Sequence, residues 1–125
     1  MNIESGFRRA NKMERELLLR LMEAEFPGRN ELALMIQDIL VRTIDEFGSL
    51  ELQSQSERTV QVIQRVPVEA EAKDIDGHEI HIMLHVVDGR PVELEILKID
   101  GDSILRMPDP PAFELVVLPP VPRLP

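Results

Sequence analysis

With 125 residues, the chain is long enough to bury one hydrophobic core and too short for two domains of ordinary size. It contains no cysteine, tryptophan or tyrosine, which excludes disulfides, thiolate metal sites and thiol nucleophiles and leaves few stacking platforms for bases. The formal net charge is −9. Because a negative field repels phosphate backbones, we expect no nucleic-acid binding.

The first residues of the chain bear on its location. Residues 1–12 carry charged side chains and lack the apolar stretch of a signal peptide. No later stretch approaches the ~20 apolar residues that a membrane helix needs. We therefore expect a cytoplasmic protein that makes no membrane contact.

The predicted elements begin with two helical patterns. Asn11 followed three residues later by Glu14 is typical of a capping box, and apolar side chains at helical spacing then predict a helix over residues 12–25. A Pro-Gly pair ends that helix. Asn30 is predicted to cap a second, shorter helix that passes into a strand near Leu40.

Beyond the helices the hydrophobic period changes to two, which is typical of strands. We expect strands at residues 40–45, 49–53, 59–66, 68–73, 79–87, 91–98 and 103–107, with a bulge or a sheet edge at Pro67. Asp-Gly dipeptides spaced twelve residues apart, at 76–77, 88–89 and 100–101, are predicted to form the turns between the last four. The sequence thus indicates an α+β fold with an N-terminal helix, and a second short one, packed on an antiparallel β-meander of about five to six strands.

The register of the meander follows from its buried face, because a slip of one residue would invert every side chain. The residues predicted to point inward are Val68, Ala70, Ala72, Ile80, Ile82, Leu84, Val86, Val92, Leu94 and Ile96. This set places three oppositely charged or His–carboxylate pairs directly across the ladder, namely Glu71–His81, Lys73–Glu79 and His85–Glu93. The pairs were not used to choose the register, so they support it.

The domain is expected to end near residue 108, and residues 109–125 form a proline-rich tail. Its apolar segment 113–118 is predicted to dock as an edge strand, on its own sheet or on that of a second copy. Pro119 and Pro122 have the spacing of a polyproline ligand, although a tail of this composition is also typical of an extended chain without a function.

Candidate site residues gather first on the outer face of the meander. They are the partner-binding candidates Glu69, Glu71, His81, His85, Glu93 and Glu95. Four residues along a strand span roughly 13 Å, too far for His81 and His85 to share one metal ion, so we interpret them as separate His–carboxylate pairs. Such a pair could orient a general base, or it could be an ordinary solvated charge pair.

A second group is predicted at one end of the sheet, where the first and third Asp-Gly turns meet. Clustered carboxylates there could bind a divalent cation; the metal candidates are Asp74, Asp76, Asp100 and Asp102. The calcium-loop pattern fails, and turns favour aspartate in any case. No catalytic triad, zinc spacing or phosphate loop can be assembled, so we expect neither enzyme activity nor a cofactor.

Several strings of residues resemble a known family. They are Leu17-Leu18, Gly48-Ser49-Leu50, Asp74-Ile75-Asp76-Gly77, and Val87-Asp88-Gly89 leading into Glu93-Leu94-Glu95-Ile96-Leu97-Lys98-Ile99-Asp100. With them, residues 9–108 are similar to a family of small bacterial proteins classed as a domain of unknown function. The resemblance implies no activity and no site residues.

From the charge pattern we expect a non-enzymatic interaction module that presents its acidic face to a basic protein partner. An immunity- or antitoxin-like inhibitor is one form of this hypothesis, because electrostatic complementarity speeds and directs such binding. The alternatives are a domain that binds a small ligand or a divalent metal, and a structural homodimer formed through residues 113–118.

Overall fold

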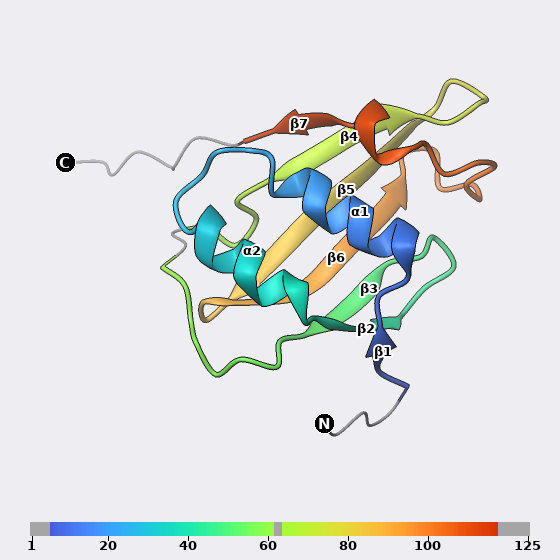
Figure 1. Ribbon diagram of the computed structural model, residues 1–125. Helices are drawn as coiled ribbons and strands as arrows, with labels where there is room; N and C mark the ends of the chain where they lie inside the picture. The colour runs from blue at the N-terminus through green and yellow to red at the C-terminus, as the bar shows by residue number, and fades with distance from the viewer. Residues whose placement is uncertain (1–5, 62–63, 118–125) are drawn as a thin grey trace.

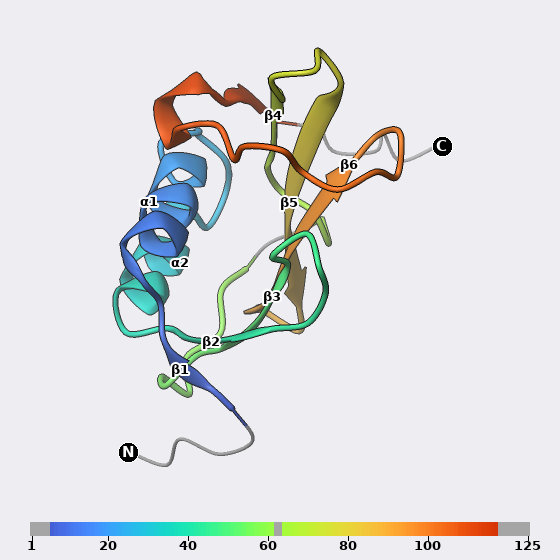
Figure 2. The ribbon, with the colours of Figure 1, turned by 90° about the vertical axis from the view of Figure 1, so that its right-hand side faces the viewer.

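The computed structural model describes residues 6–61 and 64–117, in which two helices pack on one face of a seven-stranded antiparallel sheet (Figures 1 and 2). The helices are α1 (Lys12–Leu21) and α2 (Arg29–Gln37), with a short 3₁₀ helix η1 (Pro110–Ala112). The strands are β1 (Arg8–Arg9), β2 (Leu40–Thr43), β3 (Leu50–Gln53), β4 (Glu69–Lys73), β5 (Glu79–Val87), β6 (Arg90–Lys98) and β7 (Glu114–Val116). The α+β class is confirmed, with more strands than the five to six expected.

The sheet is not a simple meander. Its strand order is β1-β2-β3-β6-β5-β4-β7, so β4, β5 and β6 follow one another as predicted, but β3 and β4 are not neighbours. The predicted hairpin of β2 and β3 is present, but it pairs through β3 with β6. The side chain of Ser49 joins these two strands, because its hydroxyl donates to the carbonyl of Ile96 at 3.0 Å and accepts from the Ile96 N–H at 2.8 Å.

The predicted strand at 59–66 is wrong, because residues 59–61 and 64–66 form no strand. Residues 62–63 lie outside the described part of the chain. The chain crosses the end of the sheet there, and the Val60 N–H donates to the carbonyl of Gly89 at 2.8 Å. A Cβ on Gly89 would lie 2.7 Å from that of Thr59. Only glycine therefore allows the Asp-Gly turn to lie beneath this crossing segment.

The predicted strand at 103–107 is also wrong. Its backbone N–H groups at Leu105 and Arg106 donate to the carboxylate of Asp74, at 2.7 and 3.0 Å. Those groups are unavailable for a ladder, so the third Asp-Gly turn leads the chain off the sheet instead of into another strand.

The helix starts show one confirmed prediction and one error. Asn11 and Glu14 form the predicted capping box, with reciprocal bonds of 2.8 and 2.9 Å. Helix α1 ends at Leu21, four residues earlier than expected. Helix α2 is capped by Gly28 and not by Asn30, which lies inside its first turn. Gly28 adopts a φ of 90°, which favours glycine at that position.

Among the described residues, no helix is long and apolar enough to cross a membrane.

The core lies between the helices and the inward face of the sheet. It combines Leu17, Leu18 and Leu21 of α1, Leu32, Met35 and Ile36 of α2, and the predicted inward residues of the strands. Ala72 and Val92 are the exceptions, since both are only half-buried. A β-bulge pairs Val86 with Pro91 and His85 with Glu93, so Pro91 takes the buried position and Val92 is the extra residue.

Residues 109–117 are part of this fold. Phe113 is completely buried, and its carbonyl accepts from the Arg20 guanidinium of α1 at 2.8 Å. The edge strand predicted at 113–118 is present as the shorter β7, which pairs with β4 of the same chain. The polyproline spacing at Pro119 and Pro122 lies outside the described residues.

Candidate functional site

The helices cover one face of the sheet and leave the other uncovered (Figure 2). Outward positions alternate along each strand, and on the uncovered face many of them are glutamates. The glutamates at these positions are Glu51 on β3, Glu69 and Glu71 on β4, Glu79 on β5, Glu93 and Glu95 on β6, and Glu114 on β7. Together with His81 and His85 they form what we call the acidic face. All six predicted partner-binding residues lie on it.

The predicted register is confirmed at every pair. Glu71–His81, Lys73–Glu79 and His85–Glu93 are direct cross-strand partners. The sheet also contains two like-charge pairs that the sequence did not suggest, Glu71–Glu114 and Glu51–Glu93. Like charges directly opposite each other destabilise a sheet, so the Glu71–Glu114 pairing is not explained by the stability of the fold, whereas Glu51 is also ion-paired with Arg42.

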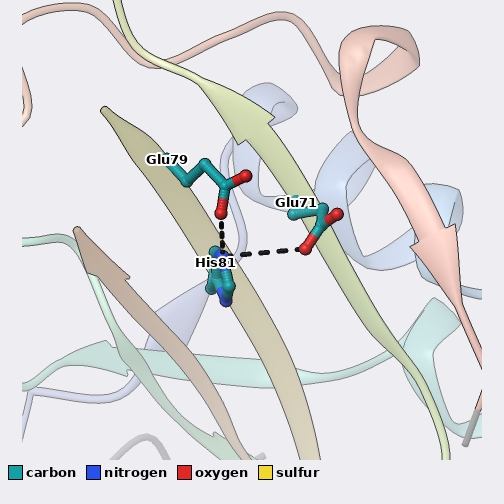
Figure 3. A group of neighbouring side chains, drawn as sticks. All are labelled: Glu71, Glu79 and His81. Carbon is teal, nitrogen blue, oxygen red and sulfur yellow. Dashed lines mark hydrogen bonds and ion pairs between the residues drawn. The ribbon is translucent and has the colours of Figure 1, made fainter. Parts of the chain in front are cut away.

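His81 lies between two carboxylates (Figure 3). Its Nε2 is 3.0 Å from the Glu79 carboxylate, two residues earlier on β5, and 3.7 Å from that of Glu71, directly across on β4. All three side chains remain partly exposed. The i, i+2 spacing along one strand and the cross-strand pairing together bring three potential ligand atoms to one point on the acidic face.

His85 has a different environment. Its Nε2 is 2.7 Å from the Glu95 carboxylate, while the guanidinium Nε of Arg65 donates to its Nδ1 at 3.1 Å. Because Nδ1 accepts a hydrogen bond, Nε2 carries the proton, and the Nε2–H donates a hydrogen bond to the Glu95 carboxylate. His81 and His85 therefore belong to separate His–carboxylate pairs, as predicted, although the partner of His85 is Glu95 and not its direct neighbour Glu93.

At the end of the sheet, two of the four predicted metal candidates, Asp74 and Asp76, hold a buried lysine. The Lys98 ammonium lies 3.0 Å from the Asp74 carboxylate and 2.6 Å from that of Asp76, and its own side chain is fully buried. Asp100 approaches the same group through His78, whose Nδ1 is 3.2 Å from it. Asp102 is exposed and donates its backbone N–H to the Asp100 carboxylate at 3.0 Å.

The electrostatics of this cluster make it a structural ion pair network. Burial alone would raise the pKa of Asp74, but hydrogen bonds from the Leu105 N–H and the Lys98 ammonium outweigh it and hold that pKa well below its usual range. The hydrogen bond to Asp76 raises the pKa of Lys98 and lowers that of Asp76. The Asp74 and Asp76 carboxylates thus already have a cation of their own.

Lys98 is the residue that the sequence reasoning missed. Leu94 and Ile96 were assigned to the inward face, and Lys98 is the next residue with the same parity. A lysine at an inward position requires carboxylate partners, and the Asp74-x-Asp76 turn supplies them.

A hollow of about 320 Å³ lies away from the acidic face, near the C-terminal end of α2. It is lined by Arg9, Ala10, Arg15, Ile36, Gln37, Asp38, Ile39 and Gln55. Its volume is at the lower end of the range for small-ligand sites. Since both charge signs line it, its composition does not select a ligand class.

Several of the residues that carried the family resemblance contact one another in the structure. Ser49 joins β3 to Ile96 of β6, and Asp74 and Asp76 hold Lys98. Residues 7–108 match the family described as a domain of unknown function, DUF6984. Comparison with curated proteins and with solved structures finds no significant match. Because the match covers most of the chain, the protein belongs to the DUF6984 family.

Proposed function

We propose that this protein is a non-enzymatic interaction module that binds a basic protein partner through its acidic face. The observation that carries the proposal is the concentration of glutamates on a face that the helices leave uncovered, where Glu71–Glu114 and Glu51–Glu93 are cross-strand neighbours of like charge. The Glu71–Glu114 pairing works against the stability of the sheet, whereas Glu51 also has the Arg42 guanidinium as an ion-pair partner. The neighbouring carboxylates give this face a negative electrostatic field, which a basic partner would neutralise.

The histidines support a binding role over a catalytic one. In His85, Nδ1 accepts from Arg65 and Nε2 donates to Glu95, so neither nitrogen is available as a general base. His81 lies between two carboxylates, with no hydroxyl or thiol nucleophile among its ion-pair and hydrogen-bond partners in the described chain. The proposal therefore assigns these side chains to recognition.

The partner expected from this chemistry is a protein with a lysine- and arginine-rich surface, in the cytoplasm. An immunity- or antitoxin-like inhibitor that covers the basic site of a nuclease or toxin is one concrete form. Association through a charged surface of this kind is fast at low salt and weakens as ionic strength rises.

A capture experiment with matched variants tests the proposal. The tagged wild type, Glu71→Lys/Glu93→Lys and Glu25→Lys/Glu31→Lys are incubated with lysate of the source cells at low and at high salt. Glu25 and Glu31 are exposed in the helical part of the chain, so the second double variant changes the net charge by the same amount without altering the acidic face. We expect a stoichiometric basic partner that the first variant loses and the second retains. Capture by neither or by both variants would contradict the proposal.

A structural homodimer through residues 113–118 is a second candidate. It is favoured by the position of β7, which is the last strand of the sheet and pairs only with β4 in the described chain. Val117, which follows it, is 41% exposed. Sedimentation equilibrium of the purified protein tests this candidate; a monomer mass at the concentrations used for capture would remove it.

A further inference from the structure

Three clusters in the described chain each bring one histidine and two carboxylates together. They are Glu71–Glu79–His81, Asp76–His78–Asp100 and His85–Glu93–Glu95, and within each the potential ligand atoms lie within 4.8 Å of one another. Imidazole and carboxylate groups are ligands of divalent transition metals. Geometry alone does not distinguish the three clusters, but their neighbouring cations do.

Two of the clusters already contain a cation from the protein. The Lys98 ammonium lies 2.6 Å from Asp76 in the His78 cluster. In the His85 cluster, the Arg65 guanidinium donates to Nδ1 of the imidazole at 3.1 Å. That bond places the imidazole proton on Nε2, the nitrogen that faces Glu95, so this nitrogen has no lone pair for a metal.

None of the described residues provides such a cation to the His81 cluster. Within the described residues, no lysine or arginine nitrogen lies within 4.0 Å of the Glu71 or Glu79 carboxylates, although Lys73 is the direct cross-strand partner of Glu79. The described chain also provides no hydrogen-bond partner for Nδ1 of His81. Nδ1 can therefore hold the proton toward solvent and leave the Nε2 lone pair directed at the two carboxylates.

The spacing of the donors fits a small metal ion. Ligand atoms bonded at 2.0–2.2 Å to a tetrahedral ion lie about 3.3 Å from one another. The distances from His81 Nε2 to the Glu79 and Glu71 carboxylates, 3.0 and 3.7 Å, lie on either side of that value. The nitrogen ligand favours an ion of the zinc class over Mg²⁺ or Ca²⁺, which take oxygen ligands.

We propose that Glu71, Glu79 and His81 bind one divalent transition-metal ion such as Zn²⁺, through Nε2 of the imidazole and one oxygen of each carboxylate. The three side chains point toward one another from β4 and β5 (Figure 3), and water completes the coordination of the ion. The His85 and His78 clusters do not bind the ion with comparable affinity. This inference concerns the protein alone and does not rest on the proposed partner.

Calorimetric titration of the untagged, full-length protein with Zn²⁺ tests it, with Mg²⁺ as the control ion. We expect one Zn²⁺ per chain in the wild type, His78→Ala and His85→Ala, and at least about tenfold weaker binding in His81→Ala and in Glu71→Gln/Glu79→Gln. Circular dichroism checks the fold, and if His81→Ala does not fold, the glutamine variant decides.

Three results would overturn the inference. They are the absence of Zn²⁺ binding, an affinity unchanged by loss of His81 or of both glutamates, and a response to Mg²⁺ as strong as that to Zn²⁺. Binding of two ions, with one lost in His85→Ala, would likewise overturn the distinction between the clusters. The titration is carried out without a partner. Its outcome therefore does not decide the outcome of the capture experiment.

Discussion

Glu71 of β4 and Glu114 of β7 lie directly opposite each other on the acidic face, where their like charges oppose the pairing of the two strands. Removing one charge should relieve this repulsion, so Glu114→Gln is expected to raise the free energy of unfolding by roughly 0.2–1 kcal/mol. Urea denaturation measures the change. Glu25→Gln, at an exposed position away from the sheet, is the matched control and should have little effect. A less stable Glu114→Gln would contradict this view of the face.

The buried Lys98 is expected to be essential to the end of the sheet. In Lys98→Met the carboxylates of Asp74 and Asp76 lose the ammonium that lies 3.0 and 2.6 Å from them. An uncompensated buried charge is strongly destabilising, so the denaturant midpoint should fall sharply. The double variant Lys98→Met/Asp74→Asn should recover part of the loss. If the single variant were as stable as the wild type, the ion cluster would have no structural role.

The stability of the protein should depend on acid through Asp74. The folded state lowers the pKa of this carboxyl, so the ionised carboxylate stabilises the fold above its ordinary pKa of about 4. This stabilisation is lost as the pH falls further. We expect the free energy of unfolding of the wild type to decrease below that pH. Asp74→Asn should start lower and show a shallower decrease, measured by urea denaturation from pH 7 down to pH 2. Parallel pH profiles would show that other groups dominate.

Phe113 tests whether the C-terminal segment is part of the fold. Its side chain is completely buried in the core cluster, so Phe113→Ala should cost about 3–5 kcal/mol of stability. Leu105, which is 60% exposed, provides the control, since Leu105→Ala should change stability by no more than about 0.5 kcal/mol. Thermal or chemical denaturation gives both values. Equal effects would mean that Phe113 does not anchor the segment in solution.

The register could be predicted from sequence because a strand with one buried face has a strict parity. Once Ile80, Ile82 and Leu84 were assigned inward, the outward pairs on β4, β5 and β6 followed. The exception at Val92 arose because a β-bulge interrupts the parity beside Pro91, which has no N–H to donate.

The strand order could not be predicted, because periodicity tells which face a residue occupies and not which strand lies beside it. The placement of β3 next to β6 depends on the contact of Ser49 with Ile96, residues 47 positions apart in the chain. The loop at 103–107 depends on its bonds to the Asp74 carboxylate. Long-range side-chain to backbone bonds of this kind leave no local pattern.

The candidate site was predicted in composition and only partly in geometry. Parity placed the glutamates and histidines on the acidic face, but the pairing of His85 with Glu95 depends on rotamers that parity does not specify. Arg65 reaches His85 from a segment that the sequence assigned to a strand.

The most direct test of the central claim is the affinity of the captured partner for the purified protein, measured by calorimetry at two salt concentrations. The account predicts that Glu71→Lys/Glu93→Lys binds at least about tenfold more weakly than the wild type and has lost most of the salt dependence, while Glu25→Lys/Glu31→Lys binds as the wild type does. Equal affinity of all three proteins, or an equal loss in both variants, would contradict recognition through the acidic face.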